Sequence, residues 1–469
     1  MKFSIGYNYD IKLLSLLEAY RDNIEALYFP MPSQYLGSGR FITQKGSYAK
    51  EIPRLIKKCE ELNIKSQLLL NATCEGKIGL ENDNFTKIID YIQRLKNLGL
   101  KSLVITNPVY ISEIKKRVQP IIIESSVNCY VKNVEQALYL KNLGVDILTI
   151  DRDINRNIPL IREIRKESGL KIRLMLNEGC LRNCPFRGML YNYIAHEALN
   201  PNSHIQGVIP DQYCIKIYQE NPEKFFSIPF VPPDALRHYS GAVDYYKLTT
   251  RAFSTYKIES CLKAYIKQRF SGNLLQLLNS PGISYFSLIS YDVLKKNNYF
   301  TKMVNCAAAF VACGECGYCS KLMESSAIIN SYYLQGDRKS RENKKAITLF
   351  NKMLKFTQDK IPLHLKLIEA YFNLGEYEKA IVEGLKVTNA HKQGKSAYIL
   401  GVCYEKTGQY KKAIAQLKKA QKANPRHQIS NHLAKCYINM GKNKLADDEL
   451  KNILAKYKIA NTYTKEVPQ

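Results

Sequence analysis

Two groups of cysteines have the residue type and spacing that suit a soft metal centre. Cys180 and Cys184 are separated by three residues in the segment "NEGCLRNCPFRG", and Cys214 follows further along the chain. The second group consists of Cys306, Cys313, Cys316 and Cys319. Thiolates suit zinc and iron–sulfur clusters, and the C-x2-C-x2-C run that ends the second group resembles ferredoxin spacing. The cysteines therefore predict one or two iron–sulfur clusters, with zinc as the alternative.

Polar and charged side chains follow several apolar runs, where a barrel enzyme would place its chemistry. The catalytic candidates that this placement yields are Asp151, Arg152, Asp153, Arg156, Lys247 and Arg251. The four cations among them predict a site for a small anionic molecule, because guanidinium groups match carboxylates. The alternative for each single residue is a helix cap or a loop anchor.

Eight short β-rich runs, each followed by a helical pattern, must position these residues. The runs are residues 2–7, 24–29, 65–70, 102–106, 120–124, 146–150, 171–176 and 245–250. Eight alternating units predict an α/β fold, a β/α (TIM-like) barrel over residues 1–255, with an open doubly wound sheet as the alternative. The interval 177–244 is far longer than an ordinary connection, so an excursion is expected there. Residues 256–330 are expected to form a helical, Cys-rich extension.

A repeat begins near residue 331. Tyr371, Tyr404 and Tyr437 recur at a step of 33, and glycines and alanines keep the same step. This pattern resembles the tetratricopeptide repeat, a pair of packed helices. Residues 331–469 are therefore predicted to form an all-α repeat domain that binds a protein or peptide, or else a stabilising appendage.

The composition limits the class of protein. Hydrophobic residues make up 45% of the chain, and no apolar run is long enough to cross a membrane. The first residues contain no apolar signal core, so a cytoplasmic location is expected. The net charge of +27 has two interpretations, solvated lysine-rich helices or an RNA-binding surface.

The barrel pattern, "NEGC" after a late strand, "SSVN" two strands earlier and a lysine on the final strand together resemble the U32 "peptidase" family. The resemblance implies a [4Fe-4S] cluster held by four cysteines at the barrel mouth, and oxygen-independent hydroxylation with a small anionic oxygen donor. It matches Cys180, Cys184 and Cys214 as ligands and leaves the fourth to the segment "CGECGYC", which is the alternative site of a second cluster. In the final strand Lys247 and Arg251 match the family, whereas Thr249 and Thr250 replace its usual glutamate and glycine.

These observations predict an iron–sulfur barrel enzyme that hydroxylates or otherwise modifies a small molecule, a peptide or RNA. Two alternatives remain open, a peptidase-like hydrolase and a non-catalytic assembly protein that acts through its repeats. The chain has no H-E-x-x-H zinc-protease motif.

Overall fold

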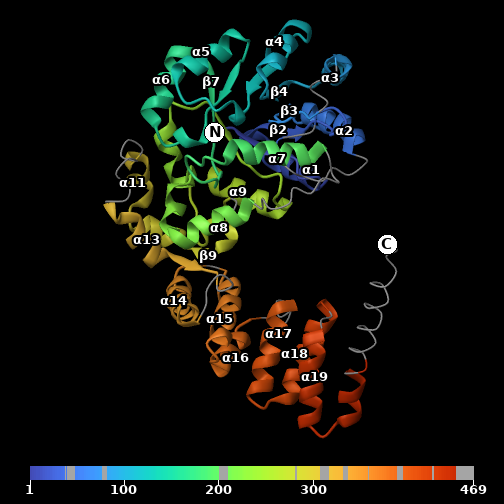
Figure 1. Ribbon diagram of the computed structural model, residues 1–469, viewed down its shortest axis with the longest axis vertical. Helices are drawn as coiled ribbons and strands as arrows, with labels where there is room; N and C mark the ends of the chain where they lie inside the picture. Colours follow the sequence, from blue (N-terminus) through green and yellow to red (C-terminus); the bar gives the residue numbers. More distant parts are fainter. Residues whose placement is uncertain are drawn as a thin grey trace, which may run out of the picture. The chain divides into compact units, whose positions relative to one another are not determined.

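A computed structural model shows that the chain forms two compact units, Met1–Ala327 and Ile328–Gln469 (Figure 1). The structure describes residues 1–36, 39, 48–76, 82–199, 210–279, 282–306, 316–330, 336–357, 359–387, 394–424, 427–449 and 451. No helix in these ranges is long and apolar enough to span a membrane.

The first unit contains a closed barrel of eight parallel strands, each paired with the next and the last paired with the first. The strands are β1 (Phe3–Gly6), β2 (Ile24–Pro30), β3 (Lys65–Leu70), β4 (Ser102–Ile105), β5 (Ile122–Ser125), β6 (Ile147–Thr149), β7 (Lys171–Met175) and β8 (Tyr245–Lys247). At the closure of the barrel, Ser4 lies opposite Lys247 in parallel register. The predicted barrel is confirmed, and its strands are buried on both faces, as parallel strands should be.

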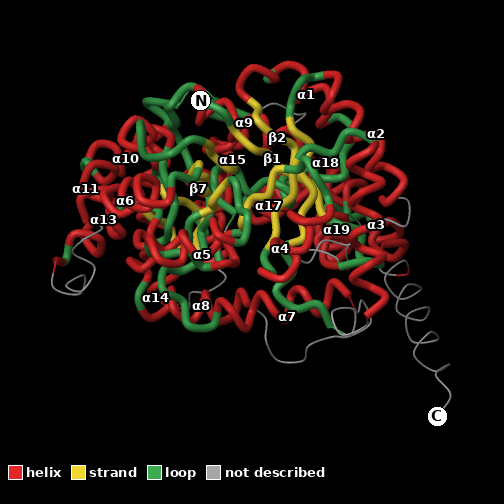
Figure 2. The backbone as a smooth tube through the Cα atoms, turned by 90° about the horizontal axis from the view of Figure 1, so that it is seen from above, coloured by secondary structure: helices red, strands yellow, loops and turns green. Residues whose placement is uncertain are grey.

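Helices surround the strands of the barrel (Figure 2). They are α1 (Leu13–Ala19), α2 (Tyr48–Glu61), α3 (Asn82–Asn97), α4 (Pro108–Arg117), α5 (Val134–Asn142), α6 (Ile158–Ser168), α7 (Arg187–Leu199), α8 (Pro210–Glu220) and α9 (Thr255–Ile266). Asn107, Asn133 and Asn157 cap α4, α5 and α6 by accepting backbone N–H groups. Each such cap contributes about 1 kcal/mol to stability. These caps fix the point at which each chain segment leaves the barrel mouth and turns into its helix.

A buried ion-pair network fills the interior of the barrel. The guanidinium of Arg173 donates to Oε2 of Glu124 and to Oε2 of Glu25, each at 2.8 Å. Gln67 also donates to Glu124, at 2.9 Å, and Lys65 donates to Glu25 at 3.0 Å. Burial raises the pKa of Glu25, but Arg173 and Lys65 outweigh it and lower that pKa to about 2. The network therefore holds a buried charge cluster without an unpaired carboxylate oxygen among the described strands.

The long interval between β7 and β8 holds α7, α8 and two 3-10 helices, Pro222–Ser227 and Pro233–Tyr239. The segment after the barrel adds β9 (Phe286–Ile289), α10 (Tyr291–Lys296), α11 (Tyr299–Asn305) and α13 (Tyr318–Ser326). It is anchored on the excursion, since Tyr291 and Lys295 both contact the carboxylate of Asp234, at 2.5 and 2.7 Å. Residues 256–327 thus belong to the same compact unit as the barrel. Strand β10 (Ala327–Ile329) lies at the boundary between the units.

The second unit consists of packed helices. They are α14 (Gly336–Met353), α15 (Ile361–Asn373), α16 (Tyr377–Leu385), α17 (Gly394–Lys406), α18 (Tyr410–Ala423) and α19 (His427–Asn439). Gly375, Gly408 and Gly441 end helices with φ of 76°, 72° and 69°, the left-handed region that favours glycine. The alanines of the repeat, Ala380, Ala413 and Ala446, are buried in the helix interfaces. The predicted tetratricopeptide-like organisation is confirmed.

Candidate active site at the barrel mouth

A cavity of about 220 Å³ lies at the carboxyl ends of the barrel strands. The residues that line it are Tyr28, Gly39, Leu69, Asn71, Ser126, Val127, Asn128, Arg152, Met175, Tyr191, Ile194, Lys247, Thr249, Arg251, Ala252 and Asn279. Its charged lining residues are Arg152, Lys247 and Arg251, and no aspartate or glutamate is among the described residues that line it. The cavity therefore has the charge and the polar lining of an anion site.

Lys247 ends β8 and is almost wholly buried. Its ammonium lies 4.5 Å from the centre of the Tyr28 ring, a cation–π contact. Burial lowers the pKa of Lys247 to about 8, since the opposing effect of Glu124 is offset by Arg173 and Arg251. The side chain can therefore change its protonation near neutral pH, which an exposed lysine cannot do.

Arg152 is placed by a 3-10 turn, Arg152–Ile154, that follows β6 and is capped by Asp151. Its guanidinium donates to the Tyr191 hydroxyl at 3.0 Å and to Oδ1 of Asn128 at 3.2 Å. The buried Nε of Arg152 has no hydrogen-bond partner within the described part of the chain. This donor is available to a bound anion.

Arg251 lies just beyond β8, where the first strand leaves room for it. A Cβ atom added to Gly6 would come within 2.5 Å of Cγ of Arg251 and 2.7 Å of the Tyr28 ring. Tyr28 is fixed in turn, because its hydroxyl donates to the carbonyl of Leu248 at 2.7 Å. Glycine at position 6 thus lets two lining side chains approach the strand closely.

The chain after β8 is tied to the end of β7 by side-chain hydrogen bonds. Oδ1 of Asn177 accepts from the backbone N–H of Thr249 at 2.7 Å and from its hydroxyl at 2.9 Å. The amide of Asn177 donates to the carbonyl of Leu277 at 3.0 Å, and that of Asn279 donates to the carbonyl of Thr249 at 3.3 Å. These bonds fix the backbone at Thr249, which lies between Lys247 and Arg251.

Three of the six predicted catalytic candidates do not line this cavity. Asp151 caps the 3-10 turn by accepting from the N–H of Asp153 at 2.7 Å, and burial raises its pKa. The carboxylate of Asp153 accepts hydrogen bonds from both terminal nitrogens of Arg187, at 2.6 and 2.8 Å. Arg156 donates to backbone carbonyls, that of Phe226 at 3.0 Å, and so supports the excursion after β7.

The first cysteine group lies beside this framework. Cys180 and Cys214 are buried and Cys184 is half-buried. Cys180 is close to both Arg152 and Arg187. Tyr191 and Glu178 raise the pKa of Arg152 and Asp153 raises that of Arg187, and Cys180 adds to both effects. It is also near Cys184, so the loop after β7 brings two cysteine side chains close to each other.

The second cysteine group lies elsewhere in the first unit. Cys306 and Cys319 line a separate cavity of about 570 Å³, together with Arg156 and Tyr299. Cys316 is exposed, and Cys313 lies outside the described residues.

A complete metal site does not emerge from the residues whose positions are described. No group of three or more His, Cys, Asp or Glu side chains in these ranges is arranged to hold a metal ion. The donor chemistry of Cys180 and Cys184 suits iron, but two sulfurs do not make a four-ligand cluster site. The [4Fe-4S] cluster and zinc stay predictions, as do Cys180, Cys184, Cys214, Cys306, Cys313, Cys316 and Cys319 as ligands.

The sequence candidates did not include several of the lining residues, among them Tyr28, Tyr191 and Asn279. In the sequence, Tyr28 resembles an ordinary strand residue, and Tyr191 resembles an ordinary helix residue. The available signal was for Tyr28 alone, as an aromatic residue near the end of a strand whose alternate side chains face the barrel interior.

Comparison with known proteins matches this region of the chain. Residues 12–180 match the model of the family described as peptidase family U32. The chain is also 27% identical over 299 residues to an uncharacterized protease of Methanocaldococcus jannaschii, covering 62% of this chain and 86% of the relative. The barrel region is therefore similar to peptidase family U32. The U32 match spans the strands β2 to β7 and ends at Cys180.

The second unit has its own match. Residues 386–453 match the family model described as anaphase-promoting complex, cyclosome, subunit 3.

Among solved structures, the U32 peptidase Mk0906 is similar with a TM-score of 0.41 and 16% identity, covering 53% of this chain and 92% of that one. A structure of MamA is similar with a TM-score of 0.26 and 19% identity, covering 38% of this chain and 99% of that one.

Proposed function

We propose that the U32 barrel is an enzyme that binds a small organic anion at its mouth and uses Lys247 to transfer a proton. The observation that carries this proposal is the charge of the cavity, where Arg152, Lys247 and Arg251 meet without a lining carboxylate among the described residues. Like charges so close and so buried repel one another. An anion would offset this repulsion and accept the free N–H of Arg152.

The size of the cavity favours a small molecule. Its volume of about 220 Å³ lies below the roughly 300–1,000 Å³ of sites for drug-sized ligands. A carboxylate or phosphate of a few carbon atoms fits such a space, whereas a folded RNA or a long peptide does not.

Lys247 supplies the reactive group of the proposal. With a pKa of about 8, roughly one amine in ten is neutral at pH 7. The neutral amine can accept a proton from an anion that Arg152 and Arg251 hold, and the ammonium can return it. A general acid–base residue works best when its pKa is near the working pH.

The hydroxylation implied by the U32 resemblance would need a redox centre in addition. The described cysteines supply two adjacent soft ligands at most. An iron–sulfur hydroxylase therefore remains the finer form of the proposal, and the steps proposed for this barrel end at anion binding and proton transfer.

Peptide hydrolysis is the second candidate, because the matched family is described as a peptidase family and the archaeal relative as a protease. We also propose that the repeat unit binds a protein partner, as tetratricopeptide-like helix pairs commonly do. The paired helices of the second unit and the family match over residues 386–453 support this role.

The test of the main proposal is calorimetric titration with a panel of short mono- and dicarboxylates and inorganic phosphate. Arg251→Gln and Lys247→Met should weaken the best-bound anion by about tenfold or more, since each removes a buried charge. The matched control is Arg162→Gln, which removes an exposed charge from α6. Equal affinity in wild type and both mouth variants would contradict the proposal, and cleavage of a casein substrate that persists in Lys247→Met would favour a hydrolase with other catalytic groups.

A further inference from the structure

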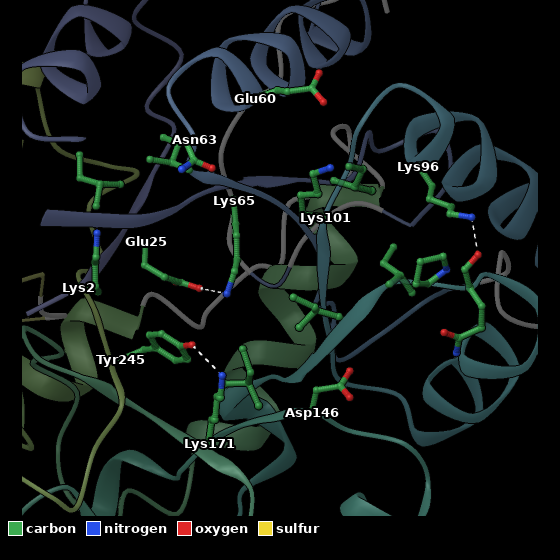
Figure 3. A pocket seen from close by; sticks show the side chains of 18 of the residues that line it. Lys2, Glu25, Glu60, Asn63, Lys65, Lys96, Lys101, Asp146, Lys171 and Tyr245 are labelled. Carbon is green, nitrogen blue, oxygen red and sulfur yellow. Dashed lines mark hydrogen bonds and ion pairs between the residues drawn. The ribbon is translucent and has the colours of Figure 1, made fainter. Parts of the chain in front are cut away.

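A second and larger cavity, of about 1120 Å³, lies at the opposite end of the barrel (Figure 3). Its lining includes Ile24, Lys65, Ile122, Ile147, Lys171 and Tyr245, which are the first residues of β2, β3, β5, β6, β7 and β8. The cavity therefore lies at the amino-terminal ends of the strands. In barrel enzymes this end ordinarily serves stability and not chemistry.

Lysines dominate the charge of this cavity. Six line it, Lys2, Lys65, Lys96, Lys101, Lys115 and Lys171, against three acidic residues, Glu25, Glu60 and Asp146. Six positive and three negative charges leave a net charge of +3 for the described lining. These lysines come from segments far apart in the sequence, so only the closed barrel brings them together.

Two of the lysines are already neutralised by acidic neighbours. Lys65 pairs with Glu25 at 3.0 Å, and Lys115 pairs with Asp146 at 2.8 Å. Lys2, Lys96, Lys101 and Lys171 make no ion pair with any residue that the structure describes. Figure 3 shows Lys96 and Lys171 bonded only to neutral oxygens, that of Lys171 being the Tyr245 hydroxyl at 3.4 Å.

Helix dipoles explain part of this arrangement and leave the rest unexplained. Lys96 and Lys115 lie in the last turns of α3 and α4, where the dipole favours a cation. Lys2, Lys101 and Lys171 are exposed residues at or before strand starts and gain nothing from a helix end. A fold selected for stability alone would pair or disperse these three charges.

The walls of the cavity offer a surface for the uncharged part of a ligand. Ile64, Leu100, Pro120 and Ile121 contribute apolar side chains. The ring of Tyr245 lies 5.2 Å from the ammonium of Lys65 and 5.8 Å from that of Lys171. An aromatic ring flanked by cations suits a molecule that has both a planar portion and negative charge.

We propose that this cavity is a binding site for a compact polyphosphate, of the kind carried by nucleoside triphosphates. Lysine binds phosphate oxygens as a point charge. A net charge of +3 on the described lining complements the several negative charges of a triphosphate. The volume of about 1120 Å³ lies just above the roughly 300–1,000 Å³ of single-ligand sites, so the cavity has room for one nucleotide-sized molecule and favours a discrete ligand over a nucleic-acid strand.

This site is independent of the anion site at the barrel mouth. The buried network of Arg173, Glu124 and Glu25 fills the barrel between them. Occupancy of the lysine-lined cavity can therefore be measured with the barrel mouth altered.

The experiment titrates the full chain with sodium tripolyphosphate and, separately, with magnesium-free ATP in a calorimeter. One ligand should bind per chain, and the double variant Lys2→Met/Lys101→Met should weaken it about tenfold, because it removes two charges that line the cavity. The matched control, Lys12→Met/Lys50→Met, removes two exposed lysines that do not line it, one just before α1 and one in α2. That control and Arg251→Gln should bind as wild type does. ATP binding more tightly than tripolyphosphate would identify a nucleotide, and equal binding would identify phosphate chains as such, both in support of the proposal.

Four results would overturn it. Unchanged affinity in Lys2→Met/Lys101→Met would remove the cavity from consideration, and an equal loss in the control pair would show nonspecific attraction to a basic surface. A loss confined to Arg251→Gln would assign the phosphate to the barrel mouth. A 12-nucleotide RNA that binds more tightly than either probe, and is lost in Lys2→Met/Lys101→Met, would replace the compact ligand with nucleic acid.

Discussion

The ammonium of Lys247 lies 4.5 Å from the centre of the Tyr28 ring, and both side chains are buried at the mouth of the barrel. An aromatic face stabilises a cation without neutralising it. Among the residues that the structure describes, Lys247 makes no ion pair, so its charge remains available to a ligand.

The pH dependence of anion binding should report the titration of Lys247. Its pKa of about 8 means that the amine is mostly protonated at pH 7 and mostly neutral at pH 9. A cation favours anion binding, so affinity should fall by roughly tenfold between these pH values. Calorimetric titrations at half-unit intervals measure this change.

Two variants make the assignment specific. Lys247→Met should bind weakly at every pH and lose the dependence, whereas Arg251→Gln should bind weakly but keep it. A pH profile of the same shape in wild type and Lys247→Met would show that another group is responsible.

Gly6→Ala should disturb the barrel mouth through simple crowding. The new Cβ would lie 2.5 Å from Cγ of Arg251 and 2.7 Å from the Tyr28 ring, so both side chains must move. We expect a loss of about 1–3 kcal/mol in the free energy of unfolding, with weaker anion binding. Urea denaturation and the anion titration measure the two effects.

Gly188→Ala is the matched control for that change. A Cβ at this position in α7 would meet its nearest atom, the Tyr130 hydroxyl, only at 4.0 Å. Alanine is the better helix former, so stability should stay the same or rise by about 0.5–1 kcal/mol. If both glycine variants lost stability equally, the close approach at Gly6 would not be the cause.

Arg173→Met should destabilise the first unit strongly. The substitution leaves Glu124 and Glu25 buried without the cation that each contacts at 2.8 Å. Breaking a buried pair in this way costs about 3–5 kcal/mol, most of it from the uncompensated charge. The exposed Arg162→Met on α6 should change stability by about 0.5 kcal/mol or less. Urea denaturation measures the free energy of unfolding of both variants. A loss of similar size in the two would argue against a structural role for the network.

Iron analysis tests the predicted cluster. If Cys180 and Cys184 are ligands, protein purified without oxygen should contain iron and acid-labile sulfide, and Cys180→Ala and Cys184→Ala should lose most of both. Cys59→Ala, which removes a buried cysteine from α2, should keep them. Iron that remains at the wild-type level in both loop variants would exclude these two residues as ligands.

Much of the fold could be predicted from local sequence patterns. Each of the eight apolar runs became a barrel strand, because parallel strands buried on both faces need near-continuous apolar sequence. The repeat was equally accessible, since Gly375, Gly408 and Gly441 recur at the step where a left-handed helix end is required.

The site was only partly accessible from sequence. The rule that strand ends share one rim placed Arg152, Lys247 and Arg251 together. It could not separate them from Arg156, whose direction depends on the excursion that supplies the carbonyl of Phe226. Tyr191 was missed for the same reason, since it reaches Arg152 from a helix whose position is set by tertiary packing.

The buried side chains around Arg173 fill the barrel interior, so no channel connects its two ends. A small molecule cannot pass along the barrel axis, so a ligand bound at one end must enter and leave from that end. Substitutions at one end of the barrel could then change its ligand without affecting binding at the other end, so a single domain could evolve two independent sites.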